Sequence, residues 1–147
     1  MKVGMVGLGK MGGNMAARIG GAGHEVVGYD AFSEATQVAS LAELVGRLDA
    51  PRVVWVMVPA GDPTEGVVSQ LAGLLAVGDV VIDGGNSNWH DSVRRAGELG
   101  ERGIGFVDAG TSGGVWGRTE GYCLIVGGAD EHVAVAQPVF DALKPPE

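Results

Sequence analysis

The most constraining feature of this chain is a glycine pattern near its start, Gly7-Leu-Gly-Lys-Met-Gly12. It follows a short apolar run and opens a stretch of helical character, Met11–Ile19. Between a strand and a helix, Gly7 makes the tight turn, Gly9 lets the backbone approach a pyrophosphate, and Gly12 lets the helix pack closely on the strand. The pattern therefore predicts a strand–turn–helix unit that cradles a dinucleotide.

An acidic residue lies where the ribose of such a dinucleotide requires one. Asp30 ends the second apolar run, Glu25–Tyr29, eighteen residues after Gly12. A carboxylate in this position accepts hydrogen bonds from the ribose hydroxyls and repels a 2′-phosphate. No arginine follows Asp30 closely to neutralise such a phosphate. We therefore expect the cofactor to be NAD rather than NADP.

Apolar runs of strand length alternate with helical stretches along the whole chain. The runs are Lys2–Val6, Glu25–Tyr29, Val53–Val58, Val80–Asp83, Ile104–Val107 and Tyr122–Val126. Helix caps are predicted at Ser40, Asp62 and Asn88, and Asp130 is predicted to open the last helix, toward Leu143. Nearly continuous apolar character is typical of strands buried on both faces. The sequence thus predicts an α/β fold, a doubly wound, mostly parallel sheet forming one Rossmann-like dinucleotide-binding domain over residues 1–147.

Composition and charge argue against several classes of partner. A net charge of −8 disfavours nucleic acid and anionic membrane surfaces, which attract clustered Lys and Arg. The longest apolar run, Val53–Val58, is far short of the roughly 20 residues of a membrane helix. The only cysteine, Cys123, rules out a disulfide within the chain and lies in an apolar run. We expect Cys123 to be a small core residue and the protein to be cytoplasmic.

Two further glycine clusters follow later strands, Asp83-Gly-Gly-Asn-Ser87 and Gly110-Thr-Ser-Gly-Gly114. In a doubly wound sheet, loops at the carboxyl ends of strands converge on the reactive end of the cofactor. Asn86 and Ser112 are then candidates for holding a polar substrate. Ordinary turns, which are also rich in Asn, Ser and Gly, explain the same composition, and the residues alone leave both interpretations open.

Several of these motifs together resemble a known family. They are Gly7–Gly12, the loop Val58-Pro59-Ala60, the Gly-Gly-Asn-Ser block with Asp91, Arg94 and Arg95 behind it, Thr111–Gly117 and Gly121–Gly128. The chain resembles the decarboxylating 6-phosphogluconate dehydrogenases, in particular their shorter bacterial subgroup, within the β-hydroxyacid dehydrogenase superfamily. The likeness covers nearly the whole chain. The Gly-Gly-Asn-Ser block is its specific part, because relatives acting on 3-hydroxyisobutyrate tend to carry a Ser-Thr pair there.

The resemblance implies a reaction and a set of site residues. The reaction is oxidation of 6-phosphogluconate by NAD or NADP, with loss of carbon dioxide to give ribulose 5-phosphate in the pentose phosphate pathway, without a metal. The implied cofactor residues are Gly7, Leu8, Gly9, Lys10, Met11 and Gly12 for the pyrophosphate and Asp30 for the ribose. Val58, Pro59 and Ala60 would border the cofactor, and Asn86 would lie between nicotinamide and substrate. The implied substrate residues are Asn86, Ser112, Gly113 and Gly114. The family also implies a homo-oligomer.

The chain departs from the family in two places. The family's general base, a lysine, and its proton donor, a glutamate, belong to a long helix after the cofactor domain, whereas this chain ends at Lys144-Pro-Pro-Glu147. We therefore expect no catalytic residue here, and a helical catalytic and dimerisation domain to be absent. Only nine residues, Ala31–Ala39, separate the second strand from the next helix cap, too few for the family's helix and edge strand. We expect this to weaken adenosine binding.

Two alternative functions stay open on the sequence. One is another β-hydroxyacid dehydrogenase with a smaller substrate, which the setting of Asn86 disfavours. The other is a noncatalytic NAD-binding module, which the absence of the lysine-bearing helix favours.

Overall fold

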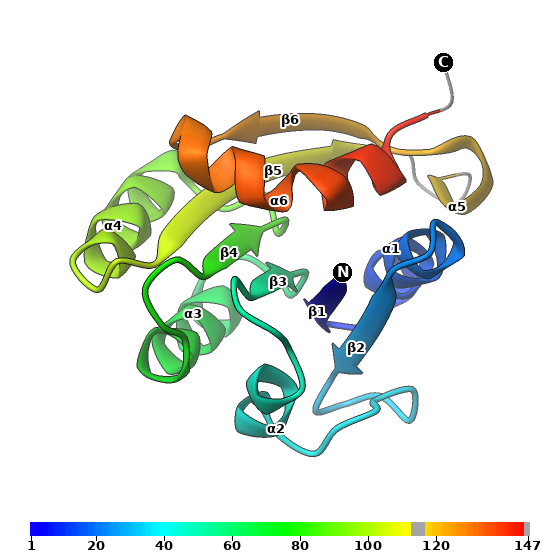
Figure 1. The fold of residues 1–147 in the computed structure, drawn as a ribbon, viewed down its shortest axis with the longest axis horizontal. Coiled ribbons are helices and arrows are strands. Elements are labelled where there is room, and N and C mark those ends of the chain that lie inside the picture. The colour runs from blue at the N-terminus through cyan, green and yellow to red at the C-terminus, as the bar shows by residue number, and fades with distance from the viewer. Residues whose placement is uncertain (113–116, 146–147) are drawn as a thin grey trace.

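A computed structural model describes residues 1–112 and 117–145 of the chain (Figure 1). The elements are β1 (Lys2–Val6), α1 (Lys10–Gly21), β2 (Glu25–Tyr29), α2 (Leu41–Gly46), β3 (Val53–Val56), α3 (Asp62–Leu74), β4 (Val80–Asp83), α4 (Trp89–Gly100), β5 (Gly105–Ser112), α5 (Gly117–Glu120), β6 (Cys123–Gly127) and α6 (Asp130–Leu143). They form one sheet in the order β2-β1-β3-β4-β5-β6. Only β6 runs antiparallel to its neighbour, so the predicted mostly parallel α/β sheet is confirmed.

Helices cover both faces of the sheet, as Figure 1 shows. Along β3 the side chains alternate: Val54 and Val56 belong to the core beneath α2, α3 and α4, whereas Val53 and Trp55 belong to the core beneath α1 and α6. The Trp55 ring meets the edge of Phe140 from α6, with ring centroids 5.9 Å apart. Burial of the central strands on both faces explains their uninterrupted apolar sequences.

Side-chain caps mark where two of the helices, α2 and α4, begin. Ser40 Oγ accepts a hydrogen bond from the backbone N–H of Glu43 (3.1 Å), and Asn88 Oδ1 accepts one from His90 N–H (2.9 Å), so both predicted caps are confirmed. The predicted cap at Asp62 is displaced by one position, because Gly61 is the N-cap and Asp62 is the first helical residue. Asp130 is the first residue of α6, as predicted. The carboxylates of Asp62 and Asp130 interact favourably with the positive end of the helix macrodipole and do not cap the helix.

The short segment after β2 contains neither a helix nor a strand, as predicted, which leaves β2 at the edge of the sheet. Gln37 closes part of this edge. Its backbone N–H donates to Gly28 O (2.9 Å), and its side-chain oxygen accepts from Gly28 N–H (2.7 Å). Thr36 Oγ1 accepts from Asp30 N–H (3.1 Å) in the same way. Two residues thus satisfy backbone groups that a neighbouring strand would otherwise pair.

At the opposite edge, β6 corrects one prediction. Cys123 is exposed rather than part of the core. The outermost strand has a helix on one face only, so Ile125 is 78% exposed, whereas Tyr122, just before the strand, is fully buried. Within residues 1–112 and 117–145, no helix is long and apolar enough to cross a membrane.

Candidate functional site

The loops that follow β1, β3 and β4 lie at the carboxyl end of the sheet, together with the last residues of β5. These four strands are consecutive neighbours and run parallel, so their carboxyl ends are side by side. The structure therefore brings together the glycine loop, Val58–Ala60 and Asn86, as the sequence predicts. Ser112 ends β5, but its side chain, Gly113 and Gly114 lie outside the described part of the chain.

In the glycine loop, Gly7 and Gly12 are required by the protein's own packing. Gly7 has φ +97°, and a Cβ there would collide with the carbonyl oxygen of Met57. A Cβ on Gly12 would collide with the carbonyl oxygen of Gly7, because α1 passes directly over the turn. These are the turn and close-packing roles that the pattern predicts.

Gly9 differs from its two neighbours in the motif. Its backbone is extended, with φ −65° and ψ −168°, and a Cβ there would meet no protein atom within 4 Å. Neither local conformation nor packing therefore demands a glycine at this position. The bare backbone faces open space, which suits the close approach of a ligand.

The start of α1 suits an anionic ligand. No acidic side chain lies in its first turn, and Gly9 caps the helix without a side-chain hydrogen bond. The first amides of a helix lack intrahelical acceptors and carry the positive end of the helix dipole. Lys10 adds an exposed positive charge at the same place. The residues present thus fit the pyrophosphate of a dinucleotide.

Asp30 lies beside this loop and is already tied to it. Its Oδ2 accepts a hydrogen bond from Leu8 N–H (2.8 Å), and its Oδ1 accepts one from Phe32 N–H (2.9 Å). A carboxylate oxygen accepts more than one hydrogen bond, so the half-buried Asp30 retains capacity for ribose hydroxyls. The sequence did not predict the bond to Leu8, nor that the Phe32 side chain is fully exposed next to this acid.

The loop after β3 packs against the loop after β4. Val58 is half-buried, whereas Pro59 and Ala60 are exposed. Thr64, fully buried in the first turn of α3, donates from its hydroxyl to Pro59 O (2.9 Å). A Cβ on Gly85 would lie 2.7 Å from the carbonyl oxygen of Val58, so only glycine allows the two loops to come this close.

Asn86 adopts the left-handed conformation, with φ +56°, and is exposed. The loop around it closes on the fully buried Asp83, which accepts hydrogen bonds from Gly85 N–H (2.9 Å) and the Ser87 hydroxyl (2.6 Å). Asn tolerates this backbone region better than most non-glycine residues. The carboxylate thereby holds a turn that presents Asn86 at the rim of the site.

A buried arginine beneath this loop is the main feature that sequence reasoning missed. The Arg95 side chain is 1% exposed, and its guanidinium contacts Asp83, Ser87 and Glu65. Hydrogen bonds from Arg94 and then Arg95 lower the pKa of Glu65 to about 2. A signal was present, because Ser92, Arg95 and Leu99 form the buried stripe of α4 and an arginine on such a stripe needs partners.

Asp108 lies opposite Asp83 in the register of β4 and β5. Burial and, secondarily, the charge of Asp83 raise the pKa of Asp108. Two carboxylates on neighbouring strands thus lie close together beneath the loop Gly84–Ser87. Elsewhere in residues 1–112 and 117–145, no group of three or more His, Cys, Asp or Glu side chains could hold a metal ion.

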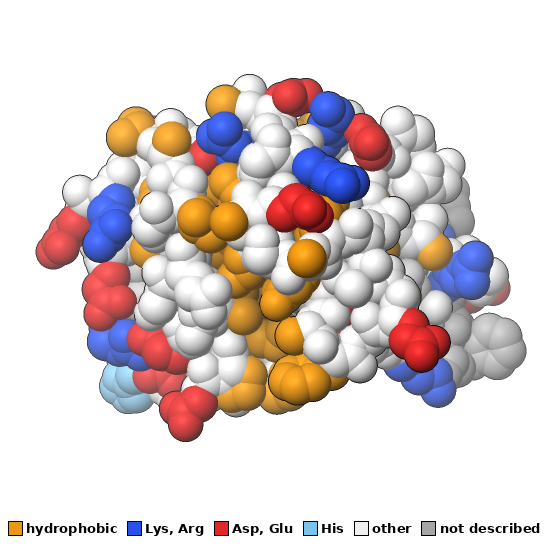
Figure 2. All heavy atoms as spheres, turned by 90° about the horizontal axis from the view of Figure 1, so that it is seen from below, with side chains coloured by type: hydrophobic (Ala, Val, Ile, Leu, Met, Phe, Trp, Pro, Cys, Tyr) orange, Lys and Arg blue, Asp and Glu red, His pale blue; other side chains and the backbone are white. Residues whose placement is uncertain are grey.

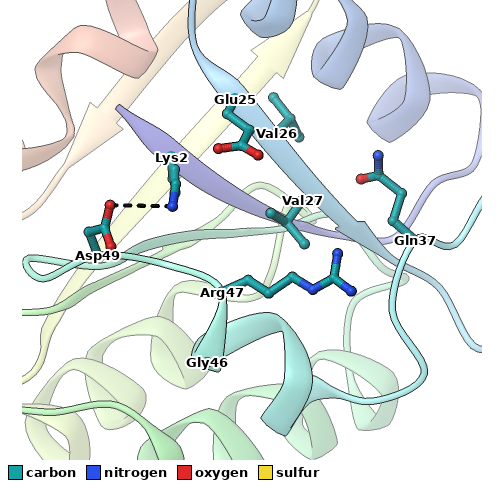
Figure 3. Close-up of a pocket in the computed structure, with 8 residues that line it drawn as sticks. All are labelled: Lys2, Glu25, Val26, Val27, Gln37, Gly46, Arg47 and Asp49. Atoms are coloured by element: carbon teal, nitrogen blue, oxygen red, sulfur yellow. Dashed lines mark ion pairs between the residues drawn. The ribbon is translucent and has the colours of Figure 1, made fainter.

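A separate pocket of about 360 Å³ lies at the other end of the sheet, and Figure 3 shows its lining. Lys2 and Glu25 are the first residues of β1 and β2, and Lys2 pairs with Asp49 (3.6 Å). This pocket is at the amino ends of the strands, away from the glycine loop. On the face that Figure 2 shows, basic and acidic side chains are interspersed, and hydrophobic side chains gather near the middle.

The sheet order, the glycine loop and the acid at the end of β2 define the chain as a dinucleotide-binding domain. Comparison with known proteins specifies it further. Residues 2–144 match the family described as the NAD binding domain of 6-phosphogluconate dehydrogenase, and the chain belongs to that family.

Named relatives support this assignment. The chain is 41% identical to the NAD(+)-dependent, decarboxylating 6-phosphogluconate dehydrogenase of Haloferax volcanii, with 97% of this chain and 50% of the relative covered. It is 35% identical to the Bacillus subtilis enzyme of the same description, with 94% of this chain and 32% of the relative covered. The chain thus spans between a third and half of the length of these relatives.

Solved structures agree on the fold. The 3-hydroxyisobutyrate dehydrogenase of Mycobacterium tuberculosis superimposes with a TM-score of 0.85 at 27% identity, with 97% of this chain and 52% of that chain covered. The 6-phosphogluconate dehydrogenase of Plasmodium falciparum gives a TM-score of 0.84 at 23% identity, with 99% of this chain and 34% of that chain covered.

Proposed function

We propose that this chain is the cofactor-binding part of an NAD-dependent 6-phosphogluconate dehydrogenase. Such an enzyme oxidises the 3-hydroxyl of 6-phosphogluconate by hydride transfer to NAD, and loss of carbon dioxide gives ribulose 5-phosphate. The observation that carries the proposal is the bare backbone of Gly9, which faces open space beside Lys10 at the start of α1. Family membership and the relatives' names support the choice of reaction.

The residues take the following roles in this proposal. Gly7 to Gly12 and the first amides of α1 hold the pyrophosphate, with Lys10 as a nearby positive charge. Asp30 accepts from the adenosine ribose, and its charge favours NAD over NADP. Val58, Pro59 and Ala60 border the nicotinamide. Asn86 lies between cofactor and substrate, and Ser112, Gly113 and Gly114 bind the sugar acid.

The general base and proton donor are supplied, in this proposal, by a helical domain that this chain does not include. The lysines of the described chain do not fill that role. Lys2 is at the amino end of β1, where it pairs with Asp49, and Lys144 follows α6. Lys10 belongs to the phosphate loop. The exposed apolar side chains of Ile125 and Val126 on β6 are in keeping with coverage by further protein, in a cytoplasmic homo-oligomer.

Two other functions are favoured by specific observations. The structural likeness to a 3-hydroxyisobutyrate dehydrogenase favours a smaller β-hydroxyacid substrate. The absence of a suitably placed lysine from the described residues favours a noncatalytic NAD-binding module. NADH formation with 6-phosphogluconate and with 3-hydroxyisobutyrate, measured on protein from the native cell, separates the two substrates.

The intact mass of the same native protein tests the division into two parts. A mass well above 14.9 kDa with turnover of 6-phosphogluconate is the expected result. A mass near 14.9 kDa with NAD binding and no turnover would replace the dehydrogenase proposal by the binding module.

A further inference from the structure

We infer that Arg95 is a positioning residue that joins the loop bearing Asn86 to the loop Val58–Ala60, so that the two sides of the site are held as one unit. What the loops bind rests on the proposed function. That they are joined rests on contacts within the chain alone.

The first half of the connection runs from Arg95 to the loop Gly84–Ser87, which carries Asn86. Arg95 Nη1 donates to Ser87 Oγ (3.1 Å) and lies 3.6 Å from Asp83 Oδ2. Ser87 donates in turn to the same carboxylate oxygen (2.6 Å). Asp83 and Arg95 are 0% and 1% exposed, so the buried carboxylate of Asp83 relies on this arginine for charge compensation. The turn that carries Asn86 is closed by this pair.

The second half of the connection runs from Arg95 to the loop Val58–Ala60. Arg95 Nε donates to Glu65 Oε2 (2.8 Å), and Glu65 belongs to the first turn of α3. The adjacent Thr64 holds the carbonyl oxygen of Pro59 (2.9 Å). The guanidinium thus reaches Ser87 with one nitrogen and the helix that follows Val58–Ala60 with another. An arginine can hold two such partners in fixed directions, whereas the lysine ammonium is a compact point charge on a flexible stem.

The neighbouring Arg94 provides a natural contrast. It also binds Glu65, through Nη1 (2.7 Å) and Nη2 (3.2 Å), but its side chain is 44% exposed. Its other ion pairs are with Asp91 and Glu98 on its own helix. Arg94 therefore ties α4 to α3 at the surface, and these three carboxylate partners all lie outside the turn around Asn86. Two adjacent arginines share one carboxylate, and only the buried one touches Ser87.

The test compares Arg95→Lys with the matched control Arg94→Lys in the 147-residue chain, by amide hydrogen exchange without ligand. We expect Arg95→Lys to speed hydrogen exchange by about tenfold or more at the Gly85 amide, whose hydrogen bond Asp83 accepts, and at the amides of residues 57, 58, 60 and 61. Exchange in α6 should stay unchanged in both variants. Equal effects of the two substitutions, or faster exchange throughout the chain, would overturn the inference.

A second variant covers the case in which Arg95→Lys does not fold. Glu65→Gln removes the charge at the other end of the bridge, on a side chain that is 33% exposed. We expect it to loosen residues 57–61 and Gly84–Ser87 together. Loosening of the first segment alone would contradict the connection.

A binding readout separates positioning from general stability. If NAD binds, its Kd should rise several-fold on Asn86→Ala in the wild-type background and much less in the Arg95→Lys background, because Asn86 is then already misplaced. Fully additive effects would overturn the inference. If the wild-type chain does not bind NAD, the proposed function fails, and the exchange experiment still decides the role of Arg95.

Discussion

The Asp30 carboxylate accepts the backbone N–H of Leu8 at 2.8 Å, so the acid at the end of β2 and the glycine loop after β1 form one structure. An acid that binds a ribose must be held at a fixed distance from the helix that binds the pyrophosphate. In the proposed function, the hydrogen bond between Asp30 and Leu8 would provide that spacing before any ligand arrives.

Replacement of Asp30 by alanine should weaken NAD binding and reduce discrimination against NADP. We expect the Kd for NAD to rise by at least about tenfold, because charge-assisted hydrogen bonds contribute roughly 1.5–3 kcal/mol. The Kd for NADP should change less, because the carboxylate no longer repels its 2′-phosphate. Titration calorimetry with both cofactors measures this, and Glu25→Gln at the far end of β2 is the control. If the ratio of the Kd values for NAD and NADP is unaltered, Asp30 does not determine the preference between the two cofactors.

Replacement by alanine should reduce the stability of the fold strongly at Gly12 and little at Gly9. Gly12→Ala places a methyl group against the carbonyl of Gly7 and should destabilise the fold by roughly 3 kcal/mol. Gly9→Ala has space and a permitted backbone, so the free energy of unfolding should change by less than about 1 kcal/mol. Urea denaturation tests both statements. Similar losses of stability in the two variants would show that Gly9 is a structural glycine.

Asn86 separates backbone strain from side-chain function. Because its φ is +56°, Asn86→Ala should cost roughly 1 kcal/mol of stability, whereas Asn86→Gly should cost little. Both variants lose the carboxamide, so both should weaken binding of 6-phosphogluconate in the presence of NAD. Urea denaturation of the two variants measures their stability, and titration calorimetry measures their binding of 6-phosphogluconate. Normal binding by Asn86→Gly would show that only the backbone matters.

The lowered pKa of the Glu65 carboxylate implies that part of the protein's stability is lost in acid. Its folded pKa of about 2 lies below the ordinary value of 4.5, so its contribution is present above about pH 4.5 and is lost as the pH falls toward 2. We expect Glu65→Gln to be less stable than wild type at pH 7 by roughly 1–2 kcal/mol, since a side chain that is 33% exposed is partly screened. The difference should shrink through this range. A difference independent of pH would contradict the assigned ion pairs.

Much of the fold could be predicted from sequence because local signals and global topology agree. The glycine pattern, the apolar runs and the caps at Ser40 and Asn88 each require little tertiary information. Cys123 was misassigned because an apolar run does not reveal whether a helix covers one face of its strand or both. The cap before α3 was displaced because Gly61, with φ +88°, takes the position predicted for Asp62.

The site was predictable where it depends on backbone and not where it depends on buried charge. The motif gives each glycine a role, and the structure distinguishes Gly9 from Gly7 and Gly12 by the space around them. Arg94 and Arg95 are adjacent and chemically identical, and only the rotation of α4 decides which is buried. The connection between the two loops depends on that rotation.

The central claim is most directly tested by titrating NAD into the wild-type chain and into its Gly9→Ala variant, with both shown to be folded. We expect saturable binding of one NAD per chain, tighter than that of NADP, and a loss of affinity of at least about tenfold in the variant. Absence of saturable binding to the folded wild-type chain, or equal affinity in the variant, would contradict this claim.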